Sequence, residues 1–272
     1  MSVDSAHVSD PAAEVSLTPL SPFGLLVEAA ARRPDLRRVP PARLTEWAAR
    51  APVLVLRGFP VLDVPELVEY CAGWGEILQW DFGPVLDLVV HESPRNYLFT
   101  RGEVPFHWDG AFADATPSYL FFQCVEAPRG GGQTLFCDTT RVFRQAPADR
   151  QEAWRGIGVT YRTEKVEHYG GQVTLPLVST HPRSGAPTMR YAEPLDPEVF
   201  LNPLALEVHG VPPGTEDAFI EDMRTRLYRL DVCYAHTWRD GDIVIADNHA
   251  LLHARRPFTT ASARRLQRVH IL

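Results

Sequence analysis

The sequence predicts a mainly β fold with flanking helices. After residue 76 the chain consists of short apolar or alternating runs that Gly, Pro, Asp and Ser interrupt. Many short strands separated by turns are typical of a sandwich, a barrel or a jelly roll. The length of 272 residues is close to the size at which one hydrophobic core stops growing. We therefore expect one domain over residues 18–272, and a small, polar, loose tail over residues 1–17.

The segments before residue 76 are predicted to be mostly helical. Residues 21–33 and 40–51 each have Pro near the start and apolar residues at helical spacing. Residues 64–75 are predicted as a third helix, which Gly75 closes. The run PVLVLRGF, residues 52–59, is predicted as a buried strand that ends in a turn.

The rest of the chain supplies most strands of the predicted fold. Two helical segments, residues 139–156 and 214–230, interrupt them. The predicted strands are residues 86–92, 95–100, 119–127, 133–140, 158–164, 173–180, 188–193, 232–238, 242–248 and 265–272.

Composition and charge exclude several classes of function. A net charge of −7, with arginines spread along the chain, provides no basic surface for nucleic acid or for a membrane. No apolar run approaches the roughly 20 residues needed to cross a bilayer, and the N-terminus lacks the pattern of a secretory signal. The four cysteines form no CxxC pair, which indicates free thiols in a reducing compartment. We expect a cytoplasmic protein that acts on a small molecule.

Two parts of the sequence supply candidate metal ligands. In VPFHWDGAF, His107 and Asp109 are two positions apart, so an extended backbone points both to the same side. In DGDIVIADNHALLHARRPF, a buried strand leads to a segment with His249 and His253. Two His and one carboxylate form the facial triad that suits non-haem Fe(II), and by spacing either His could complete it. Each part alone is also compatible with a surface turn.

The C-terminal segment SARRLQRVHIL carries candidate anion-binding residues. In a strand, Arg264, Leu266 and Arg268 share one face, and Arg265 and Gln267 share the other. Arginine binds carboxylates through two parallel hydrogen bonds, so two guanidinium groups on one face indicate a carboxylate ligand. The alternative is a solvated basic face on an edge strand, but the apolar end VHIL favours burial.

Together these residues resemble the TauD/TfdA-type Fe(II)- and 2-oxoglutarate-dependent dioxygenases. The signature of that family is His-x-Asp/Glu, a Thr or Ser some two dozen residues on, a distant His, and an Arg roughly a dozen residues later. Here Thr134 follows His107 and Asp109, with 24 residues between Asp109 and Thr134. His253 comes next, and Arg264 lies 11 positions after it. The resemblance runs roughly from the VLRGF strand to the C-terminus and implies a double-stranded β-helix, or jelly roll.

The resemblance implies that His107, Asp109 and His253 are the iron ligands, which leaves His249 without a role. Fe(II), with 2-oxoglutarate and O2 as co-substrates, would oxidise a C–H bond of the substrate. The family's halogenating relatives have a small, non-ligating residue in place of the carboxylate. Since position 109 is Asp, halogenation is disfavoured.

The resemblance also implies a binding site for 2-oxoglutarate. Thr134 and Arg264 are implied as the pair that holds its distal carboxylate, and Arg268 as a contact of the substrate or of the inner carboxylate. A carboxylate in a poorly solvated pocket needs paired charge and hydrogen bonds. Arg264 supplies the charge, and the Thr134 hydroxyl supplies a donor.

Three further stretches resemble a narrower group, the dioxygenases of isonitrile biosynthesis: TEKVEHYGG, HPRSGAPTMRYAEP and DNHALLHARRPF. This group includes enzymes that oxidatively decarboxylate an amino-acid isonitrile to a vinyl isonitrile, and enzymes that form the isonitrile from an N-carboxymethyl amino acid. The implied substrate is a small carboxylate-bearing amino-acid derivative. One alternative is simple C–H hydroxylation of a small carboxylate or sulfonate. Another is a non-redox, cupin-like metal-binding jelly roll.

Lys165 is the single lysine of the chain. The remaining 26 of its 27 Lys and Arg residues are all Arg. Lys165 lies in the first of those stretches. The resemblance implies a compact charge that reaches the substrate carboxylate, with Arg268 as a second anchor; the alternative is a surface lysine without a role. His168, Tyr169 and Tyr97 are further candidates for the substrate site, with Tyr97 expected in a strand before the iron motif.

Overall fold

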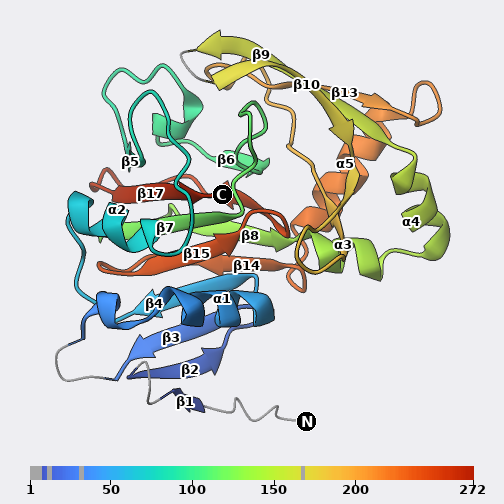
Figure 1. Cartoon of the computed structure of the whole chain (residues 1–272). Coiled ribbons are helices and arrows are strands. Elements are labelled where there is room, and N and C mark those ends of the chain that lie inside the picture. The colour runs from blue at the N-terminus through green and yellow to red at the C-terminus, as the bar shows by residue number, and fades with distance from the viewer. Residues whose placement is uncertain (1–7, 11–13, 31–33, 167–168) are drawn as a thin grey trace.

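The computed structural model describes residues 8–10, 14–30, 34–166 and 169–272. Its frame is a major sheet and a minor sheet (Figure 1). The major sheet contains, in spatial order, β1 (Val8–Asp10), β2 (Val15–Pro19), β3 (Leu25–Ala29), β4 (Val53–Arg57), β15 (Ile243–Asp247), β7 (Tyr119–Glu126), β17 (Arg265–Ile271) and β5 (Val85–Val89). The minor sheet contains β14 (Cys233–His236), β8 (Thr134–Asp138), β16 (Leu251–Arg255) and β6 (Val104–His107).

The two sheets face each other across an apolar core. Phe122 and Val244 of the major sheet lie in one buried cluster with Phe136 and Leu251 of the minor sheet. The central strands β15 and β8 are buried along their whole length, as expected where both faces of a sheet are covered. Two facing sheets built almost entirely from antiparallel pairs form the predicted jelly roll.

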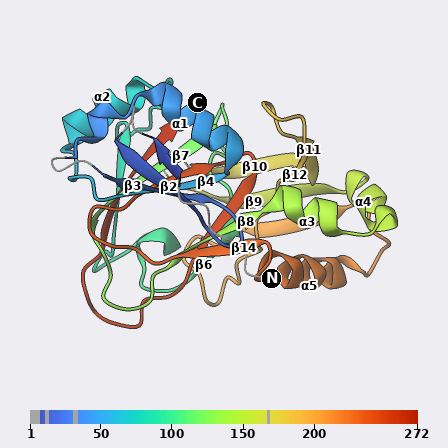
Figure 2. The same ribbon diagram turned by 90° about the horizontal axis from the view of Figure 1, so that it is seen from below.

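Helices cover the outer face of the major sheet. Both α1 (Pro41–Arg50) and α2 (Val64–Ala72), which were predicted, lie on this face (Figure 2). Trp47 of α1 and Leu67 of α2 are buried in one cluster with Leu56, Phe121 and Ile245 of the sheet. The major sheet is therefore apolar on both sides in its central part, with the helices on one side and the minor sheet on the other.

A group of helices and short strands covers the far end of the minor sheet (Figure 1). Its apolar side chains form one buried cluster with those of β6, β8 and β16. The elements are α3 (Thr139–Gln145), α4 (Ala148–Arg155), α5 (Glu216–Leu227), the sheet of β10 (Tyr169–Pro176), β9 (Gly158–Val166) and β13 (Ala205–His209), and the pair β11 (Val178–Thr180) and β12 (Pro187–Met189).

Two predictions for the N-terminal part are wrong. Residues 21–33 were expected as a helix, but Leu25–Ala29 form strand β3, which pairs in parallel with β4. The expected tail likewise contains β1 and the start of β2, which pairs with β3 and buries Val15 and Leu17. The edge of β4 offers a complete set of backbone hydrogen bonds, and this tertiary pairing outweighs the local helical preference of an Ala-rich segment.

The predicted strand at residues 95–100 is also wrong. The Asn96 side chain accepts a hydrogen bond from the Leu98 backbone at 2.9 Å and so begins a short 3-10 helix, η2 (Tyr97–Phe99). The other predicted strands coincide at least in part with strands of the structure, and β6, β13 and β16 are additional. A further 3-10 helix, η1 (Leu36–Arg38), precedes α1.

Candidate active site

Three possible metal ligands come together at one end of the minor sheet. His107 ends β6 and Asp109 follows two residues later, whereas His253 lies in β16 and pairs with His107 across the two strands. The Oδ1 atom of Asp109 lies 3.8 Å from Nε2 of His107 and 3.8 Å from Nε2 of His253. One ligand atom from each residue lies within 4.8 Å of the others. We call these three residues the ligand group.

The two histidines of the ligand group are held in the form that binds metal. Nδ1 of His107 lies 2.9 Å from the Pro105 carbonyl oxygen, to which it donates, so Nε2 keeps its lone pair. Burial lowers the pKa of His107, and burial together with the nearby His107 lowers the pKa of His253 well below its ordinary value. Both rings are therefore neutral at neutral pH, as metal ligation requires.

The carboxylate of Asp109 is fixed by two donors on its other oxygen. Arg268 Nη1 lies 2.8 Å and His270 Nε2 lies 2.9 Å from Oδ2. Burial alone would raise the pKa of Asp109, but the charge of Arg268, with the hydrogen bond from His270, lowers it well below the ordinary value. The group is thus an ionised carboxylate whose Oδ1 remains directed at the two histidines.

The backbone of Asp109 is fixed separately by the turn between β15 and β16. The Asn248 side chain accepts from the Asp109 N–H at 3.1 Å and donates to the Asp109 carbonyl at 2.9 Å. Asp247 stabilises the turn itself, because its side chain accepts from the backbone N–H groups of His249 and Ala250. One turn therefore positions Asp109 directly and leads into the strand that carries His253.

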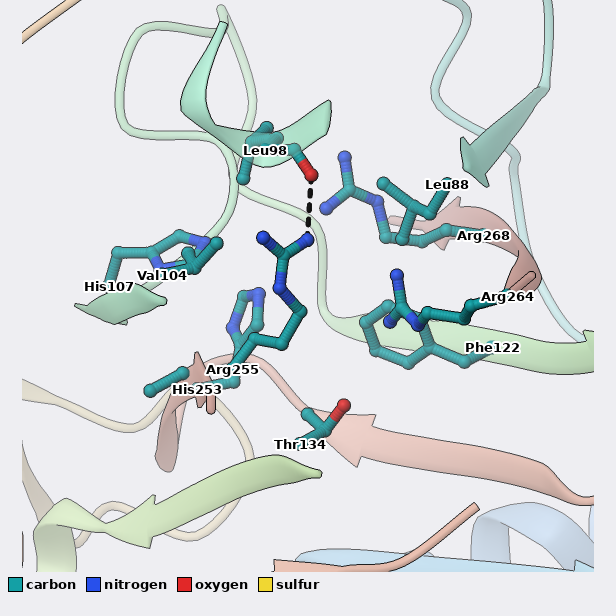
Figure 3. A pocket seen from close by; sticks show the side chains of 11 residues that line it. Leu88, Leu98, Val104, His107, Phe122, Thr134, His253, Arg255, Arg264 and Arg268 are labelled. Atoms are coloured by element: carbon teal, nitrogen blue, oxygen red, sulfur yellow. Dashed lines mark hydrogen bonds between the residues drawn. The ribbon is translucent and has the colours of Figure 1, made fainter. Parts of the chain in front are cut away.

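A small cavity of about 40 Å³ lies beside the ligand group, and we call it the smaller cavity. Thr134, Arg255, Arg264 and Arg268 line it together with both histidines (Figure 3). The Thr134 hydroxyl oxygen accepts a hydrogen bond from Trp238 Nε1 at 2.9 Å, so its own hydrogen is available to a ligand. The structure thus brings Thr134, Arg264 and Arg268 together in the lining of one cavity.

Arg264 and Arg255 differ in their partners. Arg255 donates to the carbonyls of Leu98, Thr100 and Gly102 at 2.7–2.9 Å (Figure 3 shows the first). Arg264 is 7% exposed and makes no hydrogen bond or ion pair with any residue that the structure describes. Burial, with the charge of Arg255, lowers the pKa of Arg264 to about 9. A buried guanidinium without a counter-charge is unfavourable, and a carboxylate in the smaller cavity would relieve it.

A second, larger cavity of about 380 Å³ also borders the ligand group. It shares His107, Leu98 and Arg268 with the smaller cavity, and Asp109 also lines it. Its wall is rich in aromatic side chains: Trp80, Phe82, Tyr97, Phe99 and Trp108. A flat apolar ligand in this cavity would lie directly against the ligand group.

The residues predicted for substrate binding fall in different places. Tyr97 lines the larger cavity, although from η2 rather than from a strand. Lys165 is exposed on β9 and is not among the residues that line either cavity. Tyr169 begins β10, and His168 lies outside the described residues.

The structure also distinguishes the two candidate histidines and adds residues that the sequence reasoning missed. His249 lies apart from the ligand group, and its Nδ1 accepts from Arg190. Asn248, Arg255 and His270 were overlooked. Arg255 and His270 each lie two positions from a predicted site residue, and the same i, i+2 rule that paired His107 with Asp109 could have found them.

A jelly roll that holds two histidines and a carboxylate beside an arginine-lined cavity defines the class of mononuclear non-haem iron oxygenases. Residues 17–270 match the family described as "Taurine catabolism dioxygenase TauD, TfdA family". The chain belongs to this family. The predictions of the jelly-roll fold and of an Fe(II)- and 2-oxoglutarate-dependent dioxygenase are thereby confirmed.

Three of the similar proteins have names or descriptions that refer to an isonitrile or an isocyano product. The chain is 49% identical over 263 residues to 3-((Z)-2-isocyanoethenyl)-1H-indole synthase of Fischerella ambigua, covering 96% of both chains. It is 36% identical to tyrosine isonitrile desaturase of Pseudomonas aeruginosa, covering 92% of this chain and 87% of that one. PvcB, a solved "Fe, alpha-ketoglutarate dependent oxygenase from an isonitrile synthetic pathway", superposes with a TM-score of 0.83 at 33% identity, covering 99% of this chain and 95% of PvcB.

A small-molecule substrate is consistent with these relatives. Among the described residues, no helix has the length and apolar character to cross a bilayer.

Proposed function

We propose that the protein oxidises an isonitrile derived from an aromatic amino acid, giving a vinyl isonitrile with loss of the carboxylate. The observation that carries this proposal is the larger cavity, whose aromatic wall ends at His107 and Asp109. The similarity to a synthase of an isocyanoethenyl-substituted indole and to a tyrosine isonitrile desaturase supports it. An indole or phenol ring fits such a wall through stacking and edge-to-face contacts.

In this proposal the ligand group holds Fe(II) through His107, Asp109 and His253. Arg264 and Thr134 hold the distal carboxylate of 2-oxoglutarate, because Arg264 lacks a counter-charge and Thr134 has a free donor hydrogen. When bound, iron with 2-oxoglutarate supplies O2-dependent removal of a substrate hydrogen atom. Arg268 stays paired with Asp109 and borders both cavities, so its remaining N–H groups can contact either ligand.

The proposed reaction balances as a two-electron oxidation of the substrate. The substrate loses a hydrogen from Cβ, its carboxylate leaves as CO2, and a Cα=Cβ double bond forms. Decarboxylation of 2-oxoglutarate to succinate supplies the other two electrons needed to reduce O2. One oxygen atom enters succinate and the other leaves as water.

The roles of the remaining predicted residues are part of the proposal. Tyr97 forms part of the wall against which the substrate ring lies. Lys165 is exposed on β9, so contact with the substrate carboxylate requires the β9–β10 hairpin to approach the larger cavity. Tyr169 begins β10 of the same hairpin, and His168, which lies outside the described residues, stays a proposed substrate contact with it. Lys165→Ala should raise the KM for the substrate and leave substrate-free binding of 2-oxoglutarate unchanged.

Simple C–H hydroxylation is the alternative that the cavity also permits, because an aryloxyacetate has an aromatic ring and a carboxylate as well. The chain is 26% identical over 197 residues to a 2,4-dichlorophenoxyacetate dioxygenase of Cupriavidus pinatubonensis. Formation of the isonitrile itself from an N-carboxymethyl amino acid is a second outcome. A non-redox, cupin-like metal-binding role is not proposed, since the chain belongs to a dioxygenase family.

The test is a product analysis with enzyme reconstituted under anaerobic conditions with Fe(II) and then given 2-oxoglutarate and O2. The substrates are the isonitriles of tryptophan and tyrosine, their N-carboxymethyl parents and an aryloxyacetate. We expect a vinyl isonitrile and succinate in equal amounts, and neither product with His253→Ala. A hydroxylated product that keeps its carboxylate would favour the alternative. Succinate release that none of these substrates stimulates would overturn the substrate class.

A further inference from the structure

A chain of two hydrogen bonds joins the wall of the larger cavity to the carboxylate of Asp109. Trp80 Nε1 donates to His270 Nδ1 at 2.8 Å. Because Nδ1 accepts, the ring proton of His270 lies on Nε2, which donates to Asp109 Oδ2 at 2.9 Å. The direction of both hydrogen bonds is therefore fixed by the indole N–H, which can only donate.

The two ends of this chain have different surroundings. His270 lies near the end of β17 and is 3% exposed, so its ring is held by the sheet. Trp80 lies in the connection between α2 and β5, is only partly buried, and stacks on Phe82 with 6.0 Å between ring centroids. All three rings line the larger cavity. A ligand that packs against Trp80 would restrict the end of the chain that is less constrained.

Neutralising Asp109 does not require His270. Arg268 already places a full positive charge 2.8 Å from Oδ2. His270 adds a hydrogen bond from a second direction, so two donors hold Oδ2. The carboxylate plane therefore cannot turn freely about a single hydrogen bond. The orientation of Oδ1, which faces the two histidines, depends on this second donor.

We propose that Trp80 and His270 are positioning residues that couple occupation of the larger cavity to metal binding at the ligand group. An aromatic ligand that orders Trp80 also orders His270 and Asp109, and so strengthens metal binding. By linkage the metal strengthens binding of the aromatic ligand by the same factor. The inference rests on the proposed function in one respect, that an aromatic ligand occupies this cavity.

The test measures Mn(II) affinity of the apoprotein by EPR or calorimetry, with and without indole-3-propanoate, and needs neither turnover nor 2-oxoglutarate. In the wild type we expect the probe to tighten Mn(II) binding by about 5-fold, the lower end of typical coupling. Trp80→Phe keeps an aromatic ring in the wall but removes the indole N–H, so the probe should still bind while its effect on Mn(II) is lost. His270→Leu removes both ring nitrogens and leaves Oδ2 of Asp109 with Arg268 as its donor, so it should weaken Mn(II) binding by roughly 10-fold, as loss of an outer partner of a metal ligand does.

Trp74→Phe is the matched control. The Trp74 indole donates at 2.9 Å to Thr45 and stacks on Tyr119, and Trp74 is not among the lining residues of the larger cavity. This variant also loses one indole hydrogen bond, but it should keep the full coupling. Thermal unfolding of each variant separates coupling from a general loss of stability.

The outcomes separate the coupling from the proposed function. Wild-type coupling in Trp80→Phe, or unchanged Mn(II) affinity in His270→Leu, would overturn the coupling alone. A probe that binds the wild type without changing Mn(II) affinity would do the same. A probe that does not bind the wild type would overturn both the coupling and the aromatic ligand, whereas intact coupling with no turnover of any isonitrile would overturn only the proposed reaction.

Discussion

The two cavities beside the ligand group are built in different ways. The charged and hydroxyl groups of the smaller cavity come from strands or from the residue next to one: Thr134 from β8, Arg255 from β16, Arg268 from β17, and Arg264 from the position just before β17. Much of the larger cavity's wall comes instead from residues 80–99, which are irregular apart from β5 and η2. Side chains on strands hold their positions relative to the metal, which suits a co-substrate with two carboxylates. A wall built from a connection can change shape without disturbing the sheets, and so can fit different substrates.

Among substitutions that affect one cavity and not the other, the largest effect is expected at Arg264. Arg264→Met should weaken 2-oxoglutarate binding by at least about 100-fold, since it removes the buried charge that pairs with the carboxylate. The same change should raise the melting temperature of the ligand-free protein, because an unpaired buried charge is replaced by an apolar side chain. Loss of the visible charge-transfer band with Fe(II) and 2-oxoglutarate measures the first effect.

Arg265→Met is the control for Arg264. Arg265 is the next residue but is exposed, and it pairs with Asp87 at 2.9 Å. We expect 2-oxoglutarate binding to stay within about twofold of the wild type, because exposed ion pairs contribute little. Equal losses in both variants would contradict the assignment of Arg264 to the co-substrate.

The second prediction concerns the ligand group, which borders both cavities. Asn248→Asp keeps the shape of the side chain but replaces a donating amide with a carboxylate oxygen that faces the carbonyls of Asp109 and Pro117. Mn(II) affinity should fall by about 10- to 100-fold, as for other outer partners of metal ligands. Asn248→Ala removes the same contacts without adding repulsion, so its loss should be smaller, and the reverse order would argue against the role of the amide.

The third prediction concerns the larger cavity alone. Phe99, which lies in η2 and stacks on His91 with 4.4 Å between centroids, forms part of the aromatic wall. Phe99→Ala should raise the KM for an aromatic isonitrile by roughly 10-fold, since such ring pairs and their buried area contribute about 1–2 kcal/mol. The dissociation constant of 2-oxoglutarate should stay unchanged. A parallel loss of co-substrate affinity would mean that the two cavities are not separable.

The smallest expected effect is that of pH on Mn(II) affinity, which should stay nearly constant between about pH 7.5 and pH 6. Metal and proton compete for His107 and His253, and burial lowers the pKa of both. Competition therefore begins only at a pH below the ordinary histidine value of about 6.5. Mn(II) affinity should change by no more than about twofold between pH 7.5 and pH 6. Two histidines with ordinary pKa values would lose more than about tenfold over this range, and a calorimetric titration at both pH values distinguishes the cases.

The same contrast explains how much could be predicted from the sequence. The ligand group, Thr134 and Arg264 follow recognisable spacings in strands or within two residues of a strand end. The pairing of His253 with His107 then brings the metal ligands together. Trp80 lies in an irregular connection, where no strand spacing predicts the direction of its side chain. Asn248 contacts Asp109 although 139 positions separate them in the chain. Contacts of this kind depend on how the sheets stack, which no local window of sequence contains. For the same reason the local sequence of residues 21–33 suggested a helix, whereas pairing with β4 makes Leu25–Ala29 a strand.

Because the single lysine is exposed, cleavage after it can be used to follow the position of the β9–β10 hairpin. A lysine-specific endoproteinase has one target bond, after Lys165, near the end of β9, and would give fragments 1–165 and 166–272. The first fragment would carry His107 and Asp109, and the second would carry His253 and Arg264. A ligand that brings Lys165 to the larger cavity should slow this cleavage, so the rate of nicking follows hairpin closure without any label.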